Sequence, residues 1–124
     1  MPVPEKVRAR CRALLAEGDV LQYVVPATSL MLGGLAAVRH FVLAVTDRHI
    51  TVLACGEFSR MKPVSVWEQL PRSTRLGPVE IQPSLGPTVA FGGMQFEIDE
   101  EYVAAVRAAD LEGASANLPP DPFS

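Results

Sequence analysis

Hydrophobic and polar positions alternate along the middle of the chain in the manner of β-strands, while both ends carry the spacing of amphipathic helices. Near the N-terminus, Pro4 and Glu5 precede a row of apolar residues at helical spacing, and Gly18 follows that row. We therefore expect a short helix before residue 18. Its apolar positions are Val7, Cys11, Leu14 and Leu15.

From Val20 onward the period becomes that of strands. The pattern predicts a first strand at Leu21–Val25 that Pro26 ends, and then a long apolar loop or bent edge at Thr28–Ala36. A hairpin follows, with its turn at Asp47-Arg48. The expected core face of this hairpin holds Phe41, Leu43, Val45, Ile50 and Val52.

Four more strands complete a predicted set of seven. The first is Pro63–Leu70, in which Val64 and Val66 alternate with Ser65 and Trp67. The second is Val79–Gln82. The last two, Thr88–Phe91 and Met94–Ile98, form a tight hairpin because Gly92-Gly93 supplies the positive φ angles of a two-residue turn.

After the strands, the spacing returns to that of a helix. Asp99 is the expected N-cap, Glu100 and Glu101 suit the first turn, and Gly113 is the expected end. The apolar stripe holds Tyr102, Val103, Val106 and Ala109. The chain thus divides into an N-terminal helix (1–18), a β-rich domain (19–112) and a flexible, proline-rich tail (113–124).

Length, charge and cysteine spacing limit the classes of function that the chain can have. A length of 124 residues suits one domain, and a net charge of −3 with a pI near 5.3 argues against nucleic acid as a partner. Cys11 and Cys55 are far apart and show no CxxC spacing, which indicates free thiols and a reducing, cytoplasmic location. A disulfide between the two remains an alternative.

One segment raises the question of a membrane. Val20–Val38 carries no formal charge, approaches the length of about 20 residues that spans a bilayer, and follows several basic residues. However, Gln22, Pro26 and the Gly33-Gly34 pair divide it. We therefore expect strand and loop rather than a spanning helix. A membrane-surface position for the N-terminal helix stays open as well, because arginines flank its apolar stripe.

The run "FVLAVTDRHITVL" resembles the hairpin between the second and third strands of bacterial pleckstrin-homology-like (PH-like) domains. "VWEQLPRSTRLGPVEI" and "VAFGGMQFEIDEEYVAAVRAAD" are similar to the fourth and fifth strands and to the closing hairpin plus helix of that family. The resemblance covers about Glu17 to Asp110. It implies a mainly β fold, a partly open seven-stranded antiparallel barrel capped by a C-terminal helix. It also implies a binding module with no enzymatic activity and no cofactor.

The residues themselves point to no catalytic or metal site. Cys11, Cys55, His40 and His49 are the zinc-type ligands, but no pair of them has ligand spacing. His49 and Cys55 share a face of one predicted strand and lie about 20 Å apart at roughly 3.3 Å per residue, which is too far for a nucleophile and its base.

Two candidate surfaces remain. In a PH-like barrel, the ends of neighbouring loops would gather an anion site, for example for a lipid headgroup, from Arg39, His40, Arg60 and Lys62. The second surface is apolar and comprises Leu30, Met31, Leu32 and Leu35, which Trp67 and Leu53 would extend unless the N-terminal helix covers Trp67. We therefore expect a module that binds a protein partner or a second copy of itself. The alternative is an anion or phospholipid-headgroup module recruited to a membrane surface.

Overall fold

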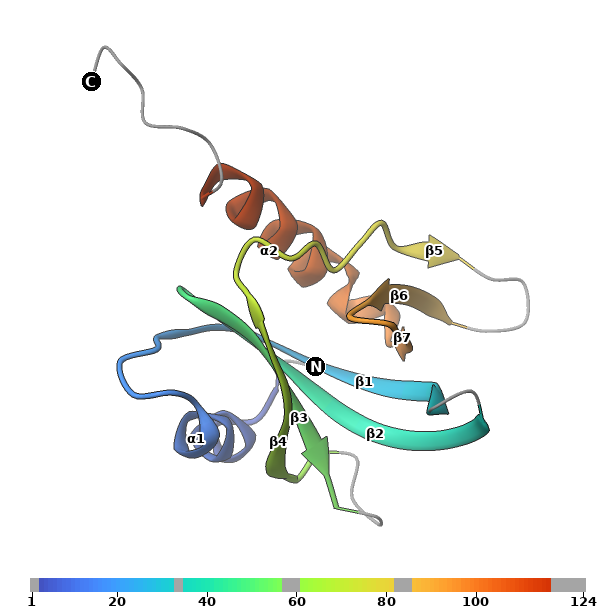
Figure 1. Ribbon diagram of the computed structural model, residues 1–124, viewed down its shortest axis with the longest axis horizontal. Helices are drawn as coiled ribbons and strands as arrows, with labels where there is room; N and C mark the ends of the chain where they lie inside the picture. The colour runs from blue at the N-terminus through green and yellow to red at the C-terminus, as the bar shows by residue number, and fades with distance from the viewer. Residues whose placement is uncertain (1–2, 33–34, 57–60, 82–85, 117–124) are drawn as a thin grey trace.

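The computed structural model describes residues 3–32, 35–56, 61–81 and 86–116, and for residues 30–32, 35–37 and 114–116 it describes the backbone only. In these residues, seven strands lie between a short N-terminal helix and a longer C-terminal one (Figure 1). The elements are α1 (Glu5–Leu14), β1 (Leu21–Leu32), β2 (Leu35–Thr46), β3 (His49–Cys55), β4 (Pro63–Pro71), β5 (Glu80–Ile81), β6 (Pro87–Phe91), β7 (Met94–Ile98), the 3-10 turn η1 (Glu100–Tyr102) and α2 (Val103–Ala116).

The strands form one antiparallel sheet in the order β4-β3-β2-β1-β7-β6-β5. β1 joins its two halves, because it pairs with β2 along most of its length and with β7 at Ala27–Ser29. The sheet is not closed into a barrel: β4 and β5 remain its edges. The predicted fold class is confirmed as a mainly β protein with a seven-stranded antiparallel sheet, a C-terminal helix and a short N-terminal helix.

The prediction for the first strand was wrong in one respect. Pro26 does not end it, and the expected loop at Thr28–Ala36 is the far part of a long β1–β2 hairpin in which Leu32 pairs with Leu35. A strand tolerates proline where one of its sides lacks a partner, and β1 pairs with β7 only from Ala27 onward. None of the described helices is long and apolar enough to cross a membrane.

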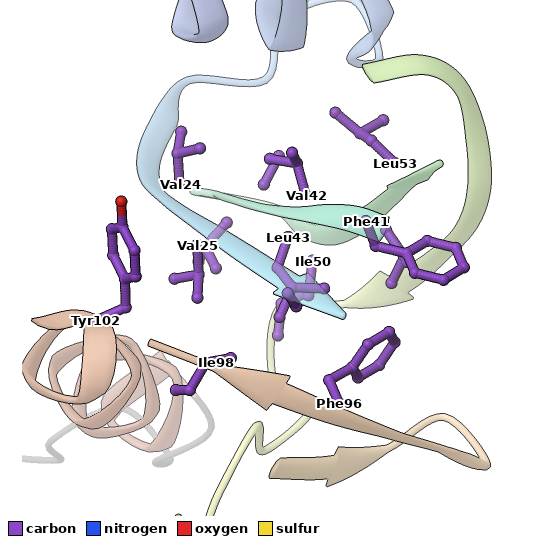
Figure 2. Packing of buried hydrophobic residues seen from close by; sticks show 14 of the residues in the cluster. Val24, Val25, Phe41, Val42, Leu43, Ile50, Leu53, Phe96, Ile98 and Tyr102 are labelled. Carbon is purple, nitrogen blue, oxygen red and sulfur yellow. The ribbon is translucent and has the colours of Figure 1, made fainter. Parts of the chain in front are cut away.

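Both faces of the β1–β3 region are buried. On one face, the five predicted core residues of the β2–β3 hairpin are confirmed as buried, and Figure 2 shows Leu43 and Ile50 of that face directed toward Phe96 and Ile98 of β7. The other face was expected to be more exposed. There, Val24, Val42 and Leu53 point toward α1 (Figure 2), which buries its own Val7 and Cys11.

Leu53 was therefore wrongly assigned to an exposed patch, since it is fully buried. The reason is the second layer that α1 adds, whose apolar stripe falls where it was predicted. Because both faces of β3 are buried, most of its residues are apolar and do not alternate with polar ones.

The C-terminal hairpin and helix agree with the pattern apart from the helix end. Gly92 and Gly93 have φ angles of 59° and 76° and join β6 to β7. Asp99 precedes η1, although its side chain makes no capping hydrogen bond. Gly113 was expected to end the helix, but α2 continues through it to Ala116.

Candidate binding surfaces

The β4 edge of the sheet is the longer of its two edges. β4 pairs with β3 along seven register positions and, among the described residues, has no strand on its other side, whereas the opposite edge, β5, is two residues long. An edge strand presents unpaired backbone N–H and C=O groups that another strand can use. β4 is therefore the edge with more capacity for pairing.

The pairing of β4 with β3 contains two β-bulges. Val52 pairs with Glu68 and Leu53 with Val66, so Trp67 has no partner residue on β3. Val64 likewise has no partner, next to the position at which Cys55 pairs. Such bulges bend a strand and re-aim its side chains. As a result, the predicted alternation does not appear in the burial of β4: Val64, Ser65, Val66 and Trp67 are all exposed in succession.

Trp67 forms the most distinctive contact on this edge. Its ring packs edge-on against Phe41, with the centroids 5.4 Å apart, and the guanidinium carbon of Arg39 lies 5.1 Å from the Trp67 ring centroid. Trp67 nevertheless stays 45% exposed. The alternative prediction was that the N-terminal helix covers this side chain. Instead, Trp67 packs against Phe41, which lies on the face of the sheet away from α1 (Figure 2).

The remainder of β4 approaches the β6–β7 turn. A Cβ atom added to Gly92 would lie 3.2 Å from Oε2 of Glu68 and 3.4 Å from Cδ1 of Leu70. This contact involves the side chains of Glu68 and Leu70, which are half-buried. Uninterrupted exposure is found at residues 64–67, and we call the N-terminal half of the strand, residues 63–67, the open β4 segment.

The other predicted interface residues lie on the β1–β2 hairpin. Leu30, Met31 and Leu32 belong to β1, and Leu35 begins β2. Their side chains lie outside the part of the structure that is described. An apolar contact surface at these four positions stays a prediction.

Of the four predicted anion ligands, the three that the structure describes do not share one direction. Arg39 lies over Trp67, whereas His40, the next residue of β2, places Nδ1 3.1 Å from the Thr28 hydroxyl. Successive residues of a strand point to opposite faces. Arg60 lies outside the described residues.

Lys62 instead lines a hollow of about 240 Å³ between α1 and the start of β4. Lys6 and Arg10, one turn apart on α1, line the same hollow with Val7 and Met61. No carboxylate among the described residues pairs with these three cations. The i, i+4 spacing of Lys6 and Arg10 was a visible signal of a shared direction, but the position of α1 beside Lys62 was not.

The cysteines and His49 are occupied by structural roles. Neither cysteine forms a disulfide and both are buried; burial raises the pKa of Cys11 to about 11 and raises that of Cys55 as well. Nδ1 of His49 lies 2.8 Å from Oδ2 of Asp19. In the described part of the chain, no three histidine, cysteine or acidic side chains gather as metal ligands would.

The chain matches no family model, no curated protein and no solved structure, so its function has to be inferred from these surfaces.

Proposed function

We propose that the protein is a non-enzymatic binding module of the PH-like type that acts through protein contacts at the open β4 segment. The observation that carries this proposal is the run of exposed residues at Val64–Trp67 on the longer edge of the sheet. Trp67 and Arg39 supply the two residue types most enriched among binding hot spots. Addition of a strand to such an edge is a common mode of recognition.

The partner that the segment fits best is a second copy of itself. In an antiparallel pair of β4 strands centred on Ser65, Val64 lies opposite Val66 of the second copy. Lys62 then lies opposite Glu68 of the second copy, and the two-fold symmetry repeats each pair. Cross-strand apolar pairs and opposite charges both stabilise antiparallel strands, and a symmetric dimer is the commonest oligomer.

The test is the mass of the protein in solution as a function of concentration, measured by sedimentation. We expect a dimer that dissociates when Val66 is replaced by lysine, because the new ammonium groups would face apolar side chains. Val66 is 49% exposed, so the Val66→Lys chain retains its core. The matched control is Ile81→Lys on β5, since Ile81 is 72% exposed at the other edge and its replacement leaves the dimer intact.

Charge reversal tests the register. Lys62→Glu and Glu68→Lys each place like charges opposite one another and weaken the dimer, whereas the double variant restores it. Trp67, the single tryptophan of the chain, reports the same event through its emission. A wild-type chain that remains monomeric at every concentration, or a double variant no better than the single ones, contradicts self-pairing.

A second candidate function rests on the hollow beside α1. Lys6, Arg10 and Lys62 surround it, and apolar Val7 and Met61 lie between them. Such a set suits an anion, and a phospholipid headgroup would recruit a cytoplasmic protein to a membrane surface.

Sedimentation with vesicles of neutral or anionic phospholipid tests this candidate. Binding to anionic vesicles alone is expected, with loss at high salt because exposed charges are screened within about 8 Å at physiological ionic strength. Lys6→Gln and Arg10→Gln weaken it, while Arg8→Gln is the control, because Arg8 lines a different depression, together with Tyr23 and Tyr102. Equal binding to both vesicle types contradicts a headgroup site.

A further inference from the structure

A groove of about 580 Å³ lies between α2 and the segment that joins β4 to β5. This volume falls within the range of about 300–1,000 Å³ that is usual for small-molecule pockets. Its lining residues overlap neither with the open β4 segment nor with the lining of the hollow beside α1. It therefore belongs to neither surface considered above.

The walls of the groove are held in place by one side chain of α2. Asp110 accepts hydrogen bonds from the backbone N–H of Leu76 at 2.7 Å and of Gly77 at 2.8 Å. Leu76 is itself fully buried. The joining segment is thus tied to the helix at the groove.

The lining is mainly apolar. Val106 is fully buried beneath the groove, Pro78 and Val79 form the wall on the joining segment, and Leu111 stands on the helix with 72% of its surface exposed. Arg107 and Leu111 are one turn apart on α2, as are Val106 and Asp110, so two adjacent rows of the helix face the groove.

Two cations border this apolar lining. Arg75 comes from the joining segment and Arg107 from α2, and both are exposed. Neither pairs with a carboxylate among the described residues. Asp110 is the only acidic residue lining the groove in the described structure, and its two oxygens already accept the hydrogen bonds of Leu76 and Gly77. The groove therefore offers two guanidinium groups to an incoming anion.

We propose that this groove binds a small amphipathic carboxylate, a molecule with one alkyl chain and one carboxylate group. The alkyl chain lies over Pro78, Val79 and Leu111, where it removes apolar surface from water. The carboxylate lies at Arg75 and Arg107, since guanidinium is the side chain best matched to a carboxylate's two oxygens. The alkyl chain of a neutral or cationic amphiphile of equal length could contact the apolar lining, but its head group would not pair with the two arginines.

Titration with decanoate, kept below the concentration at which it aggregates, tests the proposal by calorimetry and by amide chemical shifts. We expect saturable binding, with the largest shifts at Val79 and Leu111. Arg75→Gln and Arg107→Gln each weaken binding by about tenfold, the change that 1.4 kcal/mol produces. Both arginines are exposed, so an unchanged melting temperature confirms that each variant is folded. Arg48→Gln, at the exposed turn between β2 and β3, is the matched control and leaves the affinity unchanged.

Three results would overturn this assignment. Decanol or decyltrimethylammonium binding as tightly as decanoate would remove the carboxylate subsite. Unchanged affinity in both groove variants would place the ligand elsewhere. Absence of saturable decanoate binding to the wild-type chain would remove the site. None of these results bears on dimer formation at β4, which is measured without any ligand.

Discussion

A Cβ atom added to Gly113 would lie 2.7 Å from Nη1 of Arg72 and 3.0 Å from its backbone oxygen. Arg72 is buried there, and its Nη1 donates a 3.0 Å hydrogen bond to the carbonyl of Ala109. We predict that Gly113→Ala lowers the free energy of unfolding by about 1–3 kcal/mol, as overpacking does. Helix propensity alone would raise it by about 1 kcal/mol. Urea unfolding decides between the two signs.

The matched background for that test is Arg72→Ala, which removes the obstructing guanidinium. In that background, Gly113→Ala costs less than in the wild type, and the difference is the coupling between the two residues. Equal costs in both backgrounds would mean that the guanidinium group of Arg72 is not what requires a glycine at this position.

Asp19 and His49 form an asymmetric pair. The Asp19 side chain is 1% exposed and the His49 side chain 32%, and Oδ2 of Asp19 also accepts the Thr46 hydroxyl. We predict that His49→Ala destabilises more than Asp19→Ala, because the first leaves a buried carboxylate with one partner fewer. The expected loss for His49→Ala is about 1–3 kcal/mol. Urea titrations of both variants measure it, and a larger loss for Asp19→Ala would contradict it.

The buried thiols predict an alkaline limit to stability. Burial is the main cause that raises the pKa of Cys11 from 9.0 to about 11, and Cys55 adds to the rise while Arg8 and Arg12 oppose it. Between these pH values the unfolded chain releases a proton that the folded chain keeps. The stabilisation is therefore fully present below pH 9 and is lost as the pH rises through 9 toward about 11.

Urea midpoints from neutrality to about pH 11 measure this loss. The variant Cys11→Ala/Cys55→Ala provides the control, and its stability depends less steeply on pH in this range. A slope as steep as that of the wild type would assign the alkaline loss to other groups.

The strand pattern predicted most of the fold because runs of β-branched and aromatic residues between turn residues mark strands, even though burial does not alternate along β3 or β4. It is least informative at Pro26, where the tolerance depends on which neighbouring strand is present, and at Leu53, where α1 covers a second face. The sequence around Pro26 or Leu53 does not show which element will lie beside that residue in the fold. Gly113 is a similar case, because a glycine that admits Arg72 looks the same in sequence as one that ends a helix.

The candidate sites were harder to predict than the fold. Arg39 and His40 are adjacent in sequence, yet strand geometry directs them to different partners, Trp67 and Thr28. The hollow at Lys62 can be predicted only when the position of α1 is known. The groove at Arg75 and Arg107 likewise requires the position of α2. Surfaces assembled from distant elements depend on tertiary packing, which the spacing of residues within one element does not report.

The double role of β1 affects how the chain emerges during synthesis. β1 to β4 can pair with one another as soon as they leave the ribosome, because these four strands are neighbours in the sheet in the same order as in the sequence. Their inner face, with Phe41 and Leu43, has no cover until β7 pairs with β1 near the other end of the chain. Between the emergence of β4 and that of β7, the nascent meander therefore exposes an apolar surface to solvent, and in this interval it is most accessible to chaperones and most prone to aggregation.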